Sequence, residues 1–256
     1  MRLKTIAKVI LFLSLGLFLA SRLSNGTLSF YIHPRFNPLT AVTAITFFLV
    51  GLIYAYQHRH TILHSATEHD HDHHDHTHDH DHSHDLSWLA LAILAIPVLL
   101  GVMVQPKPLG AAALGNREIN TGLLTSAQAP SGSQLAVIPT AGERNILDWL
   151  YLFRDRGNAA AFNGESVHVI GFVYRDDRFT ADEFMVSRFT VSCCVADAAP
   201  IGLIVRWPDA PELAPDQWVE VKGTFQAGTF NGNEMPLLIA DEVVNTDPPS
   251  QPYLYQ

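Results

Sequence analysis

Three apolar runs lie within the first 104 residues of the 256-residue chain. The runs at 39–56 and 86–104 hold no charged residue, and each approaches the roughly 20 residues that cross a hydrocarbon core about 30 Å thick. The first run, about 5–23, has the pattern of a first transmembrane helix or of a signal peptide. We favour an uncleaved span, so the pattern predicts a membrane α-helical N-terminal region of three spans.

Basic residues ahead of the first run predict the orientation of the spans. Arg2, Lys4 and Lys8 precede it, and Lys and Arg are enriched in the cytoplasmic flanks of membrane spans. The N-terminus is therefore predicted to be cytoplasmic. Three crossings then place the loop 58–85 in the cytoplasm and the chain after residue 104 outside. We expect a multi-pass protein of the inner (plasma) membrane.

A different pattern begins after residue 140. Apolar residues recur at helical spacing up to Gly157, which predicts a helix over 145–156. Five runs rich in β-branched or aromatic residues follow, separated by turn residues, at 166–174, 183–192, 201–207, 217–226 and 234–244. Asn231-Gly232 is a hairpin signal between the last two. Five short strands predict a small all-β barrel preceded by a helix, and the five-stranded OB-fold is the simplest candidate.

Composition separates these two parts and the segment between them. Residues 105–140 are rich in Pro, Gly, Ala and Ser and are interpreted as a linker. We therefore predict a membrane domain at 1–104 and an extracytoplasmic OB-like β domain at 141–256. Residues 140–256 hold 8 Lys+Arg against 17 Asp+Glu, which accounts for the whole net charge of −9. An acidic domain repels phosphate backbones, so no nucleic-acid partner is expected.

A run of alternating His and Asp occupies the loop between the second and third predicted spans. Its nine histidines are His69, His71, His73, His74, His76, His78, His80, His82 and His84. Neutral imidazole and carboxylate groups bind zinc, nickel, cobalt or copper. Because the run has no apolar side chain to offset the entropy of ordering it, we predict a loose loop site of low selectivity. The alternative is a charge-rich spacer without a ligand.

Cys193 and Cys194 are the only cysteines, and they are adjacent. Neighbouring α-carbons lie about 3.8 Å apart, too close for an unstrained disulfide. Three interpretations stay open. One thiol can be a small core residue at a strand end, both can bind a metal such as zinc together with Asp197 or His168, or the two can form a redox pair.

Several segments resemble the YcgQ-like family of bacterial permease subunits. They are YIHPRF between the first two spans, the His-rich loop, GFVYRDDRF at 171–179, FMVSRFTVSCCVADAAPIGLIV at 184–205 and WVEVKGTF at 218–225. The resemblance covers nearly the whole chain, and SRFTVSCCVADAAPIGL is its most specific part. It implies a partner, namely a larger multi-spanning permease in the lipid bilayer, but it supplies no catalytic residues.

Together these features predict an accessory subunit of a two-component membrane permease, linked to divalent-metal (zinc-type) transport or homeostasis. Two alternatives remain: a stand-alone membrane metal-storage or metallochaperone protein, and a thiol redox protein that uses the cysteine pair. The chain has no Gly-rich phosphate loop, no HExxH and no nucleophile–base pattern, so we predict that it is not an enzyme.

Overall fold

The computed structural model describes residues 2–59, 88–114 and 142–255. These residues form two compact units. The first unit joins 1–28 to 34–106, and the second joins the short segment 29–33 to 107–256. The predicted metal-binding histidines between 69 and 84 lie outside the described residues.

The first unit consists of apolar helices. They are α1 (Arg2–Ser24), α2 (Asn37–Gln57) and α4 (Trp88–Met103), with a 3₁₀ turn at Pro34–Phe36 before α2. Within the described residues, two helices are long and apolar enough to cross a membrane, Leu3–Ser24 and Pro34–Gln57. The first two predicted apolar helices are thus confirmed. The 16 residues of α4 rise only about 24 Å, so the third span stays a prediction.

Small residues let α1 and α2 pack closely. A Cβ added to Gly16 would lie 3.1 Å from the carbonyl oxygen of Ala44, and one added to Gly51 would lie 3.0 Å from Leu13 Cδ2. Large aliphatic side chains of α2 point away from this contact, and Leu39 and Leu52 are more than half exposed. Close packing through small residues, with an apolar exterior, is typical of helices in lipid.

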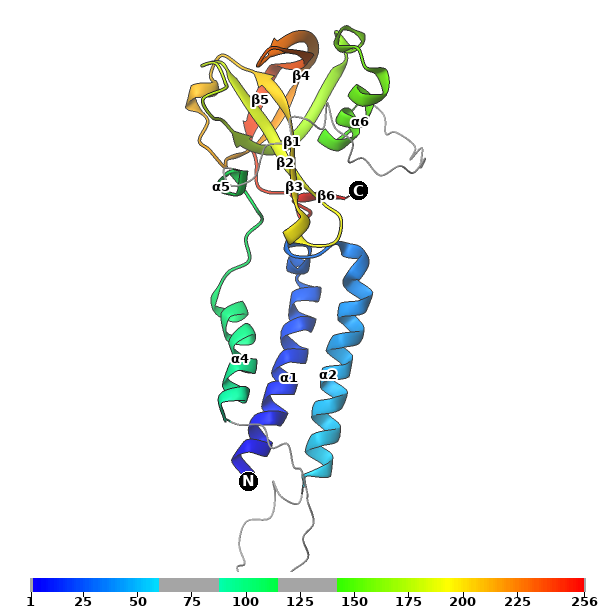
Figure 1. Ribbon diagram of the computed structural model, residues 1–256, viewed down its shortest axis with the longest axis vertical. Helices are drawn as coiled ribbons and strands as arrows, with labels where there is room; N and C mark the ends of the chain where they lie inside the picture. The colour runs from blue at the N-terminus through cyan, green and yellow to red at the C-terminus, as the bar shows by residue number, and fades with distance from the viewer. Residues whose placement is uncertain (1, 60–87, 115–141, 256) are drawn as a thin grey trace, which may run out of the picture. The chain divides into compact units, whose positions relative to one another are not determined.

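The second unit is built on a closed five-stranded barrel (Figure 1). Its strands are β1 (Ser166–Tyr174), β2 (Glu183–Val191), β3 (Ala199–Arg206), β4 (Trp218–Phe230) and β5 (Asn233–Asn245). The strand order is β1-β4-β5-β3-β2, and pairing between β1 and β2 closes the barrel. β3 and β5 run parallel, whereas the other neighbours in the barrel are antiparallel. The predicted small barrel and its five strands are confirmed.

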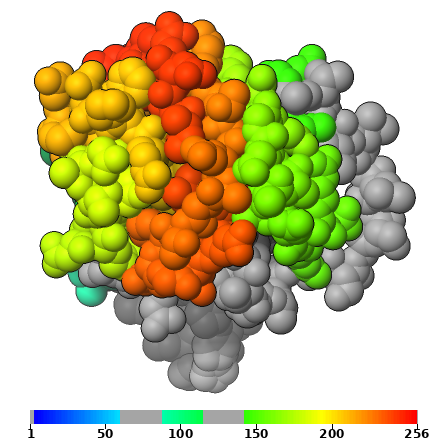
Figure 2. Space-filling view, turned by 90° about the horizontal axis from the view of Figure 1, so that it is seen from above, coloured from blue at the N-terminus to red at the C-terminus, as the bar shows by residue number. Residues whose placement is uncertain are grey.

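Local sequence explains the hairpin of β4 and β5. Val219 and Val221 point into the core and are fully buried, while Lys222 on the other face is exposed. Asn231 and Gly232 adopt positive φ angles of 48° and 82°, as a tight hairpin turn between twisted strands requires. Seen from above, this hairpin (orange) runs across the face shown in Figure 2.

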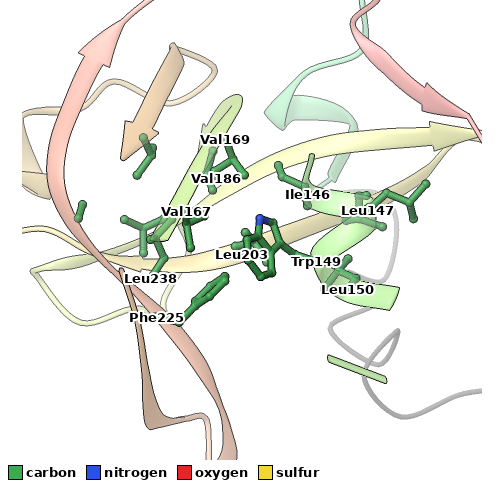
Figure 3. Close-up of a cluster of buried hydrophobic side chains, with 14 of the residues drawn as sticks. Ile146, Leu147, Trp149, Leu150, Val167, Val169, Val186, Leu203, Phe225 and Leu238 are labelled. Atoms are coloured by element: carbon green, nitrogen blue, oxygen red, sulfur yellow. The ribbon is translucent and has the colours of Figure 1, made fainter. Parts of the chain in front are cut away.

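Helix α6 (Ile146–Arg156) packs on the barrel. The side chain of Asn145 accepts hydrogen bonds from the amides of Leu147 and Asp148, and the Asp148 carboxylate accepts one from the Asn145 amide at 2.9 Å. This capping box begins the helix where the sequence predicts it. Trp149 is fully buried and meets the Phe225 ring edge-on at 4.9 Å (Figure 3). The helix therefore closes one side of the core.

Two further segments of the second unit differ from the sequence-based predictions. A sixth strand, β6 (Tyr253–Tyr255), pairs parallel to β2 outside the closed barrel. The start of the predicted linker is also part of the packed domain. It forms a short helix, α5 (Ala111–Leu114), in which Leu114 is 1% exposed and packs in a core cluster with Phe172. The remaining irregular elements are 3₁₀ turns at Thr27–Phe30, Ala159–Phe162, Val195–Asp197 and Ala210–Glu212.

Candidate metal centre

The segment after β2 folds back around one carboxylate. Oδ1 of Asp197 accepts a hydrogen bond from the Ser192 amide at 3.0 Å. Its Oδ2 accepts from the amides of Cys193 at 2.7 Å and Cys194 at 3.3 Å. Three consecutive amides that follow the end of a strand are therefore satisfied by a single side chain. Asp197 shapes the turn that carries both thiols, and we call residues 192–197 the thiol turn.

The thiol turn brings three potential metal donors together. One ligand atom each of Cys193, Cys194 and Asp197 lies within 4.8 Å of the others, and the two Sγ atoms are 3.6 Å apart. A tetrahedral ion with metal–sulfur bonds of about 2.3 Å separates two thiolates by about 3.8 Å. The observed separation of the two sulfur atoms is therefore close to the spacing that such an ion requires.

Neither thiol lies in a core. Cys193 is exposed and Cys194 is half-buried. This argues against the interpretation in which one cysteine acts as a small core residue, since such a residue would be enclosed by apolar neighbours. Both sulfur atoms are free thiols, and Cys193 faces solvent.

The electrostatics of the turn favour the protonated Cys193 thiol over its thiolate. Hydrogen bonds to Asp197 and then to Cys194 raise the pKa of Cys193 to about 11. Burial raises the pKa of Asp197, but hydrogen bonds from the Cys193 side chain and from the turn amides outweigh it and leave that pKa lowered. Reactive redox cysteines show the opposite, a lowered thiol pKa. In the metal-free turn a charged Asp197 carboxylate thus lies beside a neutral Cys193 thiol.

A segment from the other end of the chain completes the thiol turn. Ile32 forms an antiparallel bridge with Cys194. The His33 amide donates a hydrogen bond to the Cys193 carbonyl at 2.9 Å, and the Val195 amide donates one to the Tyr31 carbonyl at 2.8 Å. Residues 31–33 follow α1 and precede α2 in the sequence, and here they lie against both cysteines through a single β-bridge.

β6 holds this segment in place. The His33 ring packs against the Tyr255 ring with centroids 4.4 Å apart. The Tyr253 hydroxyl accepts a hydrogen bond from the Leu109 amide at 2.8 Å and donates one to the Phe30 carbonyl at 3.4 Å. No local sequence pattern links His33 to Cys193, because the two residues lie 160 positions apart.

His168, a suggested companion ligand, is not among the three donors of the turn. It lies on β1, where its Nε2 contacts Glu220 Oε1 of β4 at 2.8 Å. Lys222 pairs with both Glu220 and Glu242, so these side chains form an ionic ladder across neighbouring strands. The arrangement places His168 in a cross-strand pair, and the suggestion that it joins the cysteines is not supported.

The fold and the turn define a class of protein: apolar N-terminal helices followed by a β-barrel that carries a thiol–carboxylate turn. Comparison with known families gives the same division. The family description "DUF1980 N-terminal domain" matches residues 7–120, and "DUF1980 C-terminal domain" matches residues 143–256. The chain belongs to the YcgQ-like family, as the sequence segments indicate.

Two curated relatives are similar to the chain. "UPF0703 protein YcgQ" of Bacillus subtilis (strain 168) is 25% identical over 97 residues, which cover 37% of this chain and 34% of that protein. The chain is also 23% identical over 203 residues to a Streptococcus mutans protein named "Putative two-component membrane permease complex subunit". That alignment covers 64% of this chain and 72% of the relative. The chain thus spans about a third of the first relative's length.

Proposed function

We propose that this protein is the accessory subunit of a two-component membrane permease that handles a divalent, zinc-type metal ion. The name of the Streptococcus mutans relative supports the subunit role. The apolar exterior of α1 and α2 also supports it, since such helices pack against lipid or against the spans of a larger partner. The partner is a multi-spanning permease.

One observation carries the metal part of the proposal. Two thiols and a carboxylate converge within 4.8 Å on the thiol turn, and this donor set suits zinc-type ions. A second, looser site is the alternating His and Asp run from His69 to Asp85, which captures or senses metal on the cytoplasmic side. The two sites differ in donor chemistry, because one is rich in thiols and the other in imidazoles.

The pairing of residues 31–33 with the thiol turn bears on topology. Residues 29–33, which lie between α1 and α2 in the sequence, belong to the same compact unit as the barrel. This supports a topology in which the barrel is on the side of the membrane where these residues emerge. With a cytoplasmic N-terminus, this side is outside. The uncharged run 86–104, which contains α4, is then the third crossing, and the His-rich loop is cytoplasmic.

The extracytoplasmic barrel is the docking or substrate-handling module of the subunit. We regard it as OB-like, because it has five strands and its order, with β3 parallel to β5, suits a Greek-key barrel rather than an up-and-down one. Fold alone assigns no function. The role of this barrel rests on the thiol turn at the end of β2.

Purification of the tagged full chain from its native membranes in mild detergent tests the subunit role. We expect a multi-spanning membrane protein in a fixed ratio to the chain. Recovery of the chain alone, still carrying metal, would instead identify a stand-alone storage protein or metallochaperone. The same preparation with the histidines of the run 69–84 replaced by Asn should keep the partner and lose the loosely held metal.

A further inference from the structure

We propose that the thiol turn binds one thiophilic d¹⁰ cation, such as Zn²⁺ or Cd²⁺, in a three-donor site with an open fourth position, and that residues 31–33 position this site so that its occupancy is coupled to the segment joining α1 and α2. The inference rests on the proposed metal role and deepens it.

The donors of the turn select the ion. Two sulfur atoms at 3.6 Å favour soft or borderline cations over Mg²⁺ and Ca²⁺, which take oxygen ligands. The Asp197 carboxylate has about four lone-pair sites, and three of them already accept turn amides. At most one further bond therefore goes to the ion. A structural zinc site is closed by four protein ligands, whereas three donors leave one position open.

An open position at an exposed cysteine suits an ion that is passed on. Cys193 is exposed to solvent, so a thiol, an imidazole or a water molecule can approach the ion from that side. Exchange of ligands at such a site needs no opening of the fold. The ion at the turn is therefore cargo rather than a structural component.

Residues 31–33 hold the backbone that carries the thiols. The carbonyl of Cys193 and the amide of Val195, which flank Cys194, both pair with this segment, and Ile32 lies directly opposite Cys194. An ion bound to both sulfur atoms restricts the same backbone bonds. Binding of the ion, which orders the thiol turn, therefore stabilises the hydrogen bonds between the turn and residues 31–33. By linkage, these hydrogen bonds raise the affinity for the ion by the same factor.

His33 is a positioning residue in this account. Its ring packs on the Tyr255 ring with centroids 4.4 Å apart. This contact fixes His33, whose main-chain amide donates a hydrogen bond to the Cys193 carbonyl. A positioning role needs the ring but not its nitrogen atoms. His33→Phe should therefore keep the site, and His33→Ala should weaken it.

Cadmium titration of the full chain in detergent, followed by thiolate-to-cadmium charge-transfer absorption, tests the binding. This signal reports sulfur ligation and is not produced by the histidine run. We expect it to saturate at one thiolate-bound Cd²⁺ per chain. The signal should weaken, with lower affinity, in Cys193→Ser and in Cys194→Ser, which each keep one thiolate, and it should vanish in the double variant. His33→Ala should weaken binding about fivefold or more, the lower end of usual coupling energies, and His33→Phe should stay within about twofold of the native affinity. Equal loss in both His33 variants would show that the ring nitrogens are needed and would overturn a positioning role based on ring packing alone.

Hydrogen exchange tests the coupling without a substitution in residues 31–33. Cd²⁺ should slow amide exchange in residues 31–33 and 193–195 of the native chain, and it should not do so in Cys193→Ser. A normal charge-transfer signal without this protection would overturn the coupling. Absence of the signal would overturn the site itself. Neither result depends on recovery of a permease partner, so failure of the subunit role is seen separately, in the purification from native membranes.

Discussion

The main-chain amide of His33 donates a hydrogen bond of 2.9 Å to the carbonyl of Cys193. His33 lies between the first two apolar helices, whereas Cys193 follows the second strand of the barrel. The hydrogen bond therefore makes a short segment of the helical part of the sequence a structural part of the barrel. It also places that segment directly against the thiol pair, which gives the cysteine site a neighbour that sequence spacing does not reveal.

The cysteine variants separate a ligand role from a packing role. Neither thiol is buried in a core, so Cys193→Ser and Cys194→Ser should each change the free energy of unfolding by less than about 0.5 kcal/mol, as is usual at surface positions. Both should lose function in cells to a similar extent, since an ion held by two thiolates is lost when either is removed. Immunoblots of membrane fractions measure abundance. A drop in abundance in only one variant would return the pair to a packing role.

Reporter fusions test the three-span topology. Alkaline phosphatase fused after Tyr255, or inserted at Gly26 between the first two helices, should be active, because both positions are predicted to be outside. An insertion at His76 should be inactive. The same activity at His76 and after Tyr255 would mean that the run 86–104 does not cross the membrane, and the topology would be wrong.

Two neighbouring tyrosines of β6 should respond differently to loss of the hydroxyl. Tyr253→Phe removes the acceptor of the Leu109 amide and the donor to the Phe30 carbonyl, and should destabilise the barrel by about 1 to 2 kcal/mol. The buried hydroxyl of Tyr255 has no hydrogen-bond partner among the described residues, so Tyr255→Phe should be neutral or slightly stabilising. Thermal unfolding of the two variants measures both effects. Equal destabilisation would contradict the role given to Tyr253.

The histidine run should bind metal in a pH-dependent way. A peptide covering residues 58–85 is expected to bind several Zn²⁺ or Ni²⁺ ions weakly at about pH 7.5 and to release them near pH 5. Neutral imidazole is the ligand, and protons compete as the pH falls through its ordinary pKa of about 6.5. Titration calorimetry at the two pH values measures this. No heat of binding at the higher pH would remove the metal role of the run.

The barrel is predictable from sequence because its signals are local. Each of the five strands is a run of β-branched or aromatic residues, and Asn231-Gly232 supplies the positive φ angles of the hairpin. The helix 146–156 is capped by Asn145 at its start and by Gly157 at its end. Gly157 adopts a φ of 61°, and both residue types are the ones that capping positions favour. Each of these features depends on a few neighbouring residues, so it can be predicted from one sequence alone.

The missed features depend on contacts between distant residues. β6 is only three residues long and follows a proline-rich stretch, so no alternation marks it as a strand. The Pro and Gly residues around Leu114 favour a linker, yet Leu114 is almost fully buried against the barrel. For the site, sequence adjacency identified Cys193 and Cys194, but only the fold shows that Ile32 and His33 lie beside them.

The metal content of the native complex tests the central claim most directly. The full chain is purified with its partner from native membranes, once as the native protein and once with both Cys193 and Cys194 replaced by Ser, with the run 69–84 changed to Asn in both. Elemental analysis should find about one zinc-type ion per chain in the first preparation and none in the second, while the partner is retained in both. The same metal content in the two preparations would contradict a metal site at the thiol turn.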